Sequence, residues 1–600
     1  MALVVFLFAF GGTAPKSTVA ASSSPNVVVV MTDDQDQASM RVMSQVRRLI
    51  GERGATFANS FVNFSMCCPS RATFLTGQYA HNHGVMDNVP PDGGFDKLDS
   101  SNTLPVWLQR AGYATAHVGK YLNRYGQRDP LLVPPGWSEW HANVRGGVYD
   151  YDLNENGTLV HYGSGPEDFK GDVHTRNAVE FINRRADSDR PFFLSVGYTA
   201  PHESPGDEMC PDMAIPAPRD VGAFADEPLP RPPSFNEADV SDKPLRRPLL
   251  SESDIEYITG SYRCRLESLL HVDEGVNEIV SALSSAGKLG QTYVIFTSDN
   301  GYFHGEHRIR KGKIHLYEES IRVPLLIRGP GIPPGVKIND LVINADLAPT
   351  IVDVTAAEPT LIQDGRSLLD PLRGSAADRD LLIETQTYAA VRTERYIFAE
   401  HASGARELYD LAADPYQLEN RRDDPEYAVI RQLLSARLSA LRDCAGESCL
   451  APPPPEPLPP PASLPPPASL PPSPDGVVQL ELAAKRKQKA KKLTVKVGCG
   501  AVECAVELAG KGKVPKRAGS AAAAARAKKL ELKPKRVEAA AGATETVRLK
   551  FRNNRRTVKQ IQRLLHGRTK AHKRAKIVVE ATATGAGATD SATKKIKLRR

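Results

Sequence analysis

Short apolar runs alternate with longer helical stretches over the first three quarters of the chain. Three of the runs are continuous and rich in β-branched or aromatic residues, at 27–31, 192–196 and 293–297. Such runs are typical of strands that are buried on both faces of a parallel sheet. Helical stretches at 172–186 and 252–286 lie between them. This alternation predicts an α/β fold with a large, mainly parallel sheet between helices.

The last quarter of the chain follows a different pattern. Residues 451–475 are mostly proline, which fixes φ and has no amide hydrogen to donate, so they predict a semi-rigid polyproline II linker of ~75 Å. Beyond it, stretches such as 493–497 and 576–580 alternate Lys or Thr with Val, Ile or Leu, as half-buried strands do. We expect a small, β-sandwich-like accessory domain over residues 476–600.

The N-terminus resembles an export signal. An apolar run at residues 2–10 leads into small residues up to 21, as in the apolar region and cleavage zone of a signal peptide, although no Lys or Arg precedes it. The run is too short to span a bilayer, and no other segment is suited to do so. We therefore expect residues 1–24 to direct export, and we expect a secreted or cell-surface protein without a transmembrane anchor.

Eight cysteines fit an exported protein with a few disulfides. Cys444 and Cys449 close a short loop before the linker, and Cys210 and Cys264 are candidates for a second pair. The spacing alone does not decide the connectivity.

Charge divides the chain into two parts. Residues 476–600 hold 34 Lys and Arg against 8 Asp and Glu, a net charge of +26, whereas residues 1–475 hold 43 against 62, a net charge of −19. The basic tail predicts affinity for polyanions such as sulfated glycan or cell-wall polymer, and a basic surface without a function is an equal alternative. Phe551 is the only aromatic residue of the tail, which disfavours nucleic acid because single strands bind through aromatic stacking.

Acidic residues follow two of the predicted strands. Asp33 and Asp34 come directly after the first strand, and Asp299 and Asn300 come directly after the third. Ligands of such sheets gather at the carboxyl ends of the strands, and carboxylate and amide oxygens suit Ca²⁺ or Mg²⁺. Taken alone, each pair is also compatible with an ordinary acidic turn.

The most informative segment is 67–77, with the sequence CCPSRATFLTG. A Cys at a helix start with an Arg nearby can be reactive, and a buried or disulfide-bonded Cys is the alternative. The pattern C-x-P-S-R-x-x-x-L-T-G resembles the signature of the type I sulfatases. That resemblance implies a sulfatase catalytic domain over residues 25–450. It also implies that this domain has an alkaline-phosphatase-like fold with a smaller C-terminal antiparallel subdomain at about 375–445. It also implies that a formylglycine-generating enzyme converts Cys67 to formylglycine (3-oxoalanine).

The same resemblance assigns roles to the other candidate residues. It implies that Asp33, Asp34, Asp299, Asn300 and an oxygen of modified Cys67 bind the cation, which we expect to be Ca²⁺, with Mg²⁺ as the alternative. It further implies that Arg71, Lys120 and Lys313 hold the sulfate oxygens and that His202 protonates the departing sugar oxygen. In isolation, each of these four residues would be interpreted as a solvated charge or a satisfied histidine. Lys311 competes with Lys313 for its role.

Further segments are similar to one branch of the family, which holds the N-acetylglucosamine-6-sulfatases and the heparan sulfate 6-O-endosulfatases. The similarity extends over about 26–445 and does not include the tail. Many sulfatases have a His shortly after the active-site Lys, but Asn123 occupies this region here, so the base for the elimination step stays unassigned. Phe303 separates Tyr302 from His304, where the branch has a His directly after the Tyr. The similar segments are 65–83, 119–123, 135–138, 298–302, 323–331 and 407–420.

These observations predict an exported sulfatase, a sulfuric ester hydrolase active in glycosaminoglycan degradation on a sulfated sugar such as N-acetylglucosamine 6-sulfate. Hydrolysis of phosphonate or phosphate esters at the same site is an alternative, because some relatives with the C-x-P-S-R motif catalyse it. A second alternative is a catalytically silent polyanion-binding protein in which Cys67 stays unmodified.

Overall fold

The computed structural model describes residues 24–204, 210, 213–374 and 379–450 with their side chains, and the backbone of strands between 480 and 599. The signal-like segment and the Pro-rich linker lie outside the described residues. The chain divides into two units, Met1–Pro457 and Leu458–Arg600. In the described part of the chain, no helix has the length and apolar character needed to cross a membrane.

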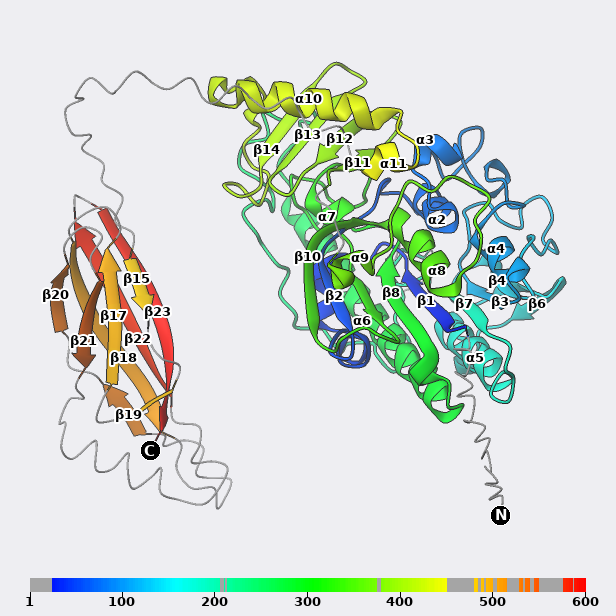
Figure 1. The fold of residues 1–600 in the computed structure, drawn as a ribbon, viewed down its shortest axis with the longest axis horizontal. Helices are drawn as coiled ribbons and strands as arrows, with labels where there is room; N and C mark the ends of the chain where they lie inside the picture. The colour runs from blue at the N-terminus through cyan, green and yellow to red at the C-terminus, as the bar shows by residue number, and fades with distance from the viewer. Residues whose placement is uncertain are drawn as a thin grey trace, which may run out of the picture. The chain divides into compact units, whose positions relative to one another are not determined.

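A ten-stranded mixed sheet forms the centre of the first unit, with the strand order β10-β2-β9-β8-β1-β7-β3-β4-β5-β6 (Figure 1). Strands β8, β1, β7, β3 and β4 run parallel, and β9, β5 and β6 run antiparallel to their neighbours. The three strands predicted from apolar runs are confirmed as β1, β7 and β8, side by side at the centre. The strands are β1 (Asn26–Thr32), β2 (Ala55–Phe61), β3 (Ala114–Gly119), β4 (Glu139–Gly146), β5 (Tyr151–Glu155), β6 (Thr158–Tyr162), β7 (Phe192–Gly197), β8 (Thr292–Ser298), β9 (Leu325–Arg328) and β10 (Val336–Ile343).

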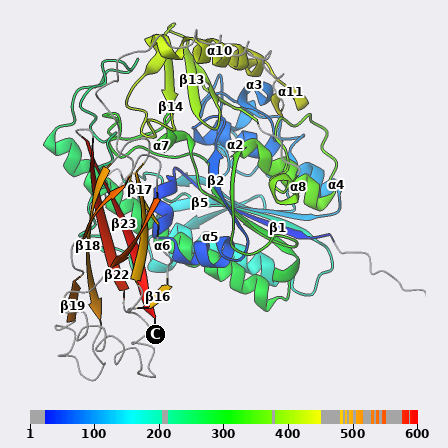
Figure 2. The same cartoon turned by 60° about the vertical axis from the view of Figure 1, so that its left-hand side comes forward.

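Helices cover both faces of this sheet (Figures 1 and 2). In β1, Val28 and Val30 pack with α5 and α6, whereas Val27, Val29 and Met31 pack with α2, α4 and α8. The run is apolar without interruption because both faces of the strand are buried. The predicted helices are confirmed as α5 and α6. The helices are α1 (Ser44–Val46), α2 (Cys67–Thr76), α3 (Ala80–His83), α4 (Leu104–Arg110), α5 (Lys170–Asn183), α6 (Glu252–Ser285), α7 (Glu318–Ile321), α8 (Leu347–Thr355), α9 (Asp370–Arg373), α10 (Ala428–Arg442) and α11 (Glu447–Leu450).

A smaller antiparallel sheet follows, with the order β11-β12-β13-β14. Helix α10 lies along it (Figure 1) and contributes Leu434, Leu438 and Leu441 to its core, since residues at this spacing share one face of a helix. This arrangement confirms the expected antiparallel sheet near the end of the sulfatase-like region. The strands are β11 (Leu381–Glu384), β12 (Tyr388–Arg392), β13 (Tyr396–His401) and β14 (Arg406–Asp410).

Two disulfides link four of the six described cysteines of this unit. Cys444 pairs with Cys449 after α10, and Cys210 pairs with Cys264 on α6. Both candidate pairs are therefore confirmed. Cys67 and Cys68 are free and buried.

The second unit is built from strands in two sheets. One sheet has the order β15-β17-β21, and the other has the order β16-β23-β22-β18-β19, with β20 also paired to β18. The stretches predicted as strands in the tail are confirmed as parts of β17 and β22. The strands are β15 (Leu480–Ala483), β16 (Lys487–Lys489), β17 (Leu493–Cys499), β18 (Cys504–Val514), β19 (Lys528–Glu531), β20 (Lys535–Ala539), β21 (Thr544–Leu549), β22 (Lys576–Gly585) and β23 (Ala588–Arg599).

Candidate active site

The carboxyl ends of the central strands bring the candidate residues together. Strands β1 and β8 are parallel neighbours in which Thr32 lies opposite Ser298, so the acidic residues that follow them leave the sheet at the same edge. The backbone N–H of Asp34 donates to Asp299 Oδ1 at 3.1 Å. The Asn300 side-chain amide donates to Asp34 Oδ1 at 2.7 Å. The two acidic turns therefore form one cluster, as the sequence predicts.

Lys120 and His202 reach the same edge from the ends of β3 and β7. The N–H of Lys120 donates to the carbonyl of Gly197 at 2.8 Å. Gly119 has a φ of +96°, and a Cβ there would lie 2.2 Å from the Gly197 carbonyl oxygen, so the close approach of the two strand ends requires a glycine. On the other side, the N–H of Asp33 donates to the Ala200 carbonyl at 3.1 Å. The turns after β1, β3 and β7 thus support one another.

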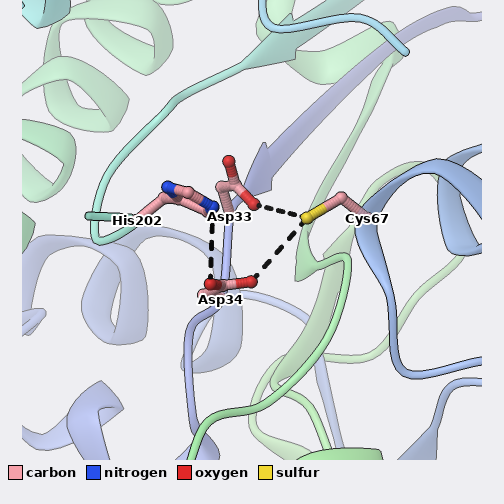
Figure 3. A group of neighbouring side chains, drawn as sticks. All are labelled: Asp33, Asp34, Cys67 and His202. Atoms are coloured by element: carbon pink, nitrogen blue, oxygen red, sulfur yellow. Dashed lines mark hydrogen bonds and ion pairs between the residues drawn. The ribbon is translucent and has the colours of Figure 1, made fainter. Parts of the chain in front are cut away.

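Cys67 is the first residue of α2 and is completely buried. Its Sγ points between the two carboxylates of the β1 turn (Figure 3), 3.3 Å from Asp33 Oδ1 and 3.9 Å from Asp34 Oδ1. Lys313 Nζ lies 3.0 Å from the same sulfur. Burial and the negative charge of Asp33 raise the pKa of the Cys67 thiol to about 12. The unmodified side chain is therefore a protonated thiol, which disfavours thiolate chemistry at neutral pH.

Basic side chains surround these carboxylates. Arg71 Nε donates to Asp299 Oδ2 at 2.7 Å, and its NH1 group donates to the Lys120 carbonyl at 2.9 Å. Lys120 forms an ion pair with Asp33, and Lys313 forms one with Asp34. Each predicted cationic residue thus lies beside a predicted acidic residue.

His202 is the remaining predicted basic residue, and it approaches the cluster from the turn after β7. Its Nε2 atom lies 3.8 Å from Asp34 Oδ2. Its Nδ1–H donates to the Glu203 carbonyl at 2.7 Å. The ring is therefore oriented with Nε2 toward the centre (Figure 3).

The electrostatics of the three carboxyl groups differ. Burial raises the pKa of Asp33, but the charges of Lys120, His202 and Arg71 outweigh it, so the pKa lies well below its usual value. Burial also raises the pKa of Asp34, but the charges of Lys313, His202 and Arg265 together outweigh it, so this pKa is lowered as well. The pKa of Asp299 is raised by burial and by the nearby charge of Asp33. Two of the three acids are thus held ionised by neighbouring cations.

The donor set fits a hard divalent cation. One ligand atom from each of Asp33, Asp34, Cys67 and His202 lies within 4.8 Å of the others. Asn300 Oδ1 is buried and has no hydrogen-bond partner, as expected for an oxygen that a cation would satisfy. Carboxylate and amide oxygens predominate, and such ligands are preferred by Ca²⁺ and Mg²⁺. His202, which we expected to act only as an acid, also lies within this group.

The structure shows which of the two competing lysines lies beside Cys67. Lys313 contacts the Cys67 sulfur, whereas Lys311 pairs with Glu203 at 2.8 Å and is 41 % exposed. His304 lies away from the sulfur, with its Nε2 atom 3.6 Å from Asp36 Oδ2.

The sequence did not point to Arg265, which is buried on α6 beside the site. Its guanidinium donates to the Pro201 carbonyl at 2.7 Å and to the Asp34 carbonyl, and it lies 3.7 Å from the centre of the Tyr302 ring. It thereby ties the turns after β1, β7 and β8 together. No motif marks it, because an Arg in a long helix has the same pattern as a surface residue.

The site combines an acidic cluster, surrounding basic side chains and a Cys at the start of a helix, all at one edge of a mixed α/β sheet. This combination defines a hydrolase of anionic esters. The family model described as Sulfatase matches residues 25–357. A second model, described as N-sulphoglucosamine sulphohydrolase, C-terminal, matches residues 305–444. The chain belongs to the sulfatase family, with the alkaline-phosphatase-like fold of that family, and is a sulfuric ester hydrolase.

Curated relatives match most of the chain. N-acetylglucosamine-6-sulfatase of Capra hircus is 35% identical over 491 residues, which cover 72% of this chain and 86% of the relative. The human protein of the same name is 34% identical over 509 residues, covering 75% and 90%. An arylsulfatase of Volvox carteri is 34% identical over 512 residues, covering 74% and 78%.

Solved structures share the fold. A structure described as a complex with its substrate D-glucosamine-2-N,6-O-disulfate has a TM-score of 0.58 and 24% identity, over 69% of this chain and 97% of that one. The phosphonate monoester hydrolase of Agrobacterium radiobacter has a TM-score of 0.52 and 23% identity, over 70% and 95%. Both similarities concern the fold alone, which therefore does not separate sulfate from phosphonate esters.

Proposed function

We propose that this sulfatase is exported and removes the 6-O-sulfate from N-acetylglucosamine in sulfated glycans, after Cys67 has been converted to formylglycine. The observation that carries the proposal is the position of Cys67, which lies in the C-x-P-S-R motif and at the centre of the acidic cluster and its cations. The relatives named N-acetylglucosamine-6-sulfatase, at 34–35% identity over most of both chains, support the choice of substrate.

Formylglycine and a divalent cation would each supply one kind of chemistry. Hydrated formylglycine would supply two hydroxyls on one carbon, one to serve as the nucleophile and one to favour release of sulfate by losing its proton. Ca²⁺ would supply Lewis-acid polarisation of an oxygen. The residues that would hold the cation are Asp33, Asp34, Asp299 and Asn300, together with an oxygen of modified Cys67.

The basic residues bind and orient the sulfate group. Lys313 Nζ lies 3.0 Å from the Cys67 sulfur. Lys120 and Arg71 lie beside Asp33 and Asp299, two carboxylates of the same cluster, so a sulfate ester at residue 67 would meet all three basic side chains. Arg71 is fixed in advance by Asp299 and the Lys120 carbonyl. Donors that are already oriented stabilise developing negative charge without reorganisation during the reaction.

His202 is proposed to supply the proton for the leaving group. Its Nδ1–H is committed to the Glu203 carbonyl, so Nε2 is the atom that holds the transferable proton. In this position it can protonate the departing sugar oxygen. The side of the site that His202 occupies is therefore the side on which the sugar lies.

The test is a substrate panel with the purified full-length chain. We expect release of sulfate from N-acetylglucosamine 6-sulfate to exceed release from galactose 6-sulfate and from 3-O-sulfated glucosamine. Faster hydrolysis of p-nitrophenyl phosphate than of p-nitrophenyl sulfate would favour the phosphonate or phosphate alternative. Mass spectrometry of the peptide with residue 67 should show the composition of an aldehyde, with oxygen in place of sulfur and two hydrogens fewer than in Cys. An unmodified Cys in an inactive protein would favour the silent polyanion-binding alternative.

We also propose roles for the parts outside the sulfatase unit. Residues 1–24 would direct export from the cytoplasm. Residues 451–475 would act as the spacer, and residues 476–600, with a net charge of +26, would hold the enzyme on polyanionic glycan or cell-wall polymer. These roles affect where the enzyme acts and leave its chemistry unchanged.

A further inference from the structure

Side-chain exposure around the site shows from which side a substrate can enter. The groups near the Cys67 sulfur are buried, with side-chain exposures of 15% for Lys120 and 11% for Lys313. His202, Glu203 and Lys311 are 35%, 25% and 41% exposed. The bulky part of a sulfate ester must remain on this open side. We call the pair of Glu203 and Lys311 the open rim.

The carboxylate of Glu203 is held in place but retains capacity to accept hydrogen bonds. It accepts from the Tyr302 hydroxyl and from Lys311 Nζ, the latter at 2.8 Å. Tyr302 is itself buried and stacked on Arg265, so the carboxylate is supported from the interior. An ionised carboxylate has about four acceptor sites, and the described part of the chain fills two of them.

Within the described residues, Lys311 likewise uses only two of its donors. Its ammonium donates to Glu203 and to the Tyr257 hydroxyl at 3.3 Å, and an ammonium has three N–H groups. An exposed ion pair contributes little to stability, so stability alone gives little reason for this arrangement. The open rim offers a fixed acceptor and a fixed donor beside the leaving-group acid.

We propose, on the basis of the function proposed above, that the open rim recognises the sugar of the substrate. Glu203 accepts a hydrogen bond from a hydroxyl or amide N–H of the amino sugar, and Lys311 donates one to a hydroxyl oxygen. The chemical class that fits is an uncharged, hydroxyl-rich amino sugar attached to the reacting sulfate. Glu203 and Lys311 thus determine specificity, and the sulfate-binding residues do not.

The test compares a sugar substrate with one that lacks the sugar. The constants kcat and KM are measured for N-acetylglucosamine 6-sulfate and for p-nitrophenyl sulfate with the wild type, Glu203→Gln and Lys311→Met. A hydrogen bond to a charged group corresponds to roughly tenfold or more in binding. In both variants we therefore expect the ratio of kcat/KM for the sugar to kcat/KM for the aryl sulfate to fall at least about fivefold, mainly through KM.

A matched control is Asp353→Asn, which removes the charge from an ion pair of similar exposure on α8, between Asp353 and Arg373 at 2.7 Å. This control should leave the ratio unchanged, and melting temperatures should show that all variants are folded. A ratio that stays at the wild-type value in both rim variants would overturn the inference and leave the proposed function standing. A wild type that hydrolyses the aryl sulfate but not the sugar sulfate would overturn both.

Discussion

The sulfatase unit and the basic tail use charge in opposite ways. In the sulfatase unit, Asp33, Asp34 and Asp299 are buried and each is paired with one particular cation. In the tail, 34 basic residues face 8 acidic ones, so no fixed pairing can neutralise them. Buried pairs depend on exact geometry and fail when one member is removed. An excess of like charge attracts polyanions through the total net charge, and salt weakens this attraction by screening.

The largest expected effect comes from the centre of the sulfatase unit. Cys67→Ala should reduce hydrolysis of p-nitrophenyl sulfate to less than about 1% of wild type, because the proposed nucleophile is lost. Cys68→Ala is the matched control, since Cys68 is also free and buried on α2, and it should stay within a few-fold of wild type. Retention of more than a few per cent of activity by Cys67→Ala would reject the assignment.

A second large effect should come from the acidic cluster. Asp299→Asn should lose bound Ca²⁺ and at least about a hundredfold in activity, because a buried cation depends on its full set of anionic ligands. Metal content is measured by elemental analysis, and the rise in melting temperature on adding Ca²⁺ gives a reading that does not depend on turnover. An active enzyme that carries stoichiometric zinc, with neither calcium nor magnesium, would contradict the proposed cation.

A moderate effect on stability should come from a partly buried pair, His81 and Glu384, that is not part of the acidic cluster. His81 Nδ1 lies 3.0 Å from Glu384 Oε1, and its Nε2 lies 2.9 Å from the Cys444 carbonyl oxygen. Burial lowers the pKa of His81, but Glu384 outweighs it and raises the pKa to about 9. A raised pKa gives stability that is fully present below the unfolded value of about 6.5 and is lost as pH rises through about 9.

The melting temperature of the wild type should therefore fall between about pH 6.5 and 9 by more than that of His81→Gln. His83→Gln is the comparison, because burial lowers the pKa of His83 to about 3 and the ring is neutral throughout this range. If the melting temperatures of the wild type and His81→Gln fall in parallel over this range, the pair of His81 and Glu384 contributes nothing to the pH dependence of stability.

The smallest effect on chemistry should come from deleting the tail. Without residues 451–600, hydrolysis of a small aryl sulfate should change by less than about twofold, since the buried pairs stay intact. Elution from heparin should shift to clearly lower salt, because counterion-dependent binding scales with the number of basic groups. Identical elution of the full-length and truncated proteins would show that the net charge has another role or none.

Much of the fold could be predicted because its signals are local. The apolar runs of β1, β7 and β8 are unbroken because these strands are buried on both faces. The acidic turns could be placed because they come immediately after two of these strands in the sequence. The resemblance of the C-x-P-S-R motif to the sulfatase signature identified Cys67 and Arg71, and the motif is local because both residues lie on α2.

The remaining parts of the site depend on contacts that the sequence does not encode locally. Lys311 and Lys313 are two residues apart and chemically identical. Only the path of the loop determines that Lys313, and not Lys311, lies beside the Cys67 sulfur. Arg265 contacts turns that lie far from it in sequence. Glu203 acquires its place from Tyr302 and Lys311, about a hundred residues later in the chain.

Neighbouring residues of α6 act on the same segment in two ways. Arg265 holds the Pro201 carbonyl, and Cys264 is bonded to Cys210, so the stretch that carries His202 and Glu203 is anchored near both of its ends. Protein produced in a reducing cytosol would lack the covalent anchor. For anyone who purifies this enzyme, the choice of expression compartment is therefore also a choice about how firmly the segment with His202 and Glu203 is held. Preparations made in the two compartments should be compared before substrate preferences are assigned.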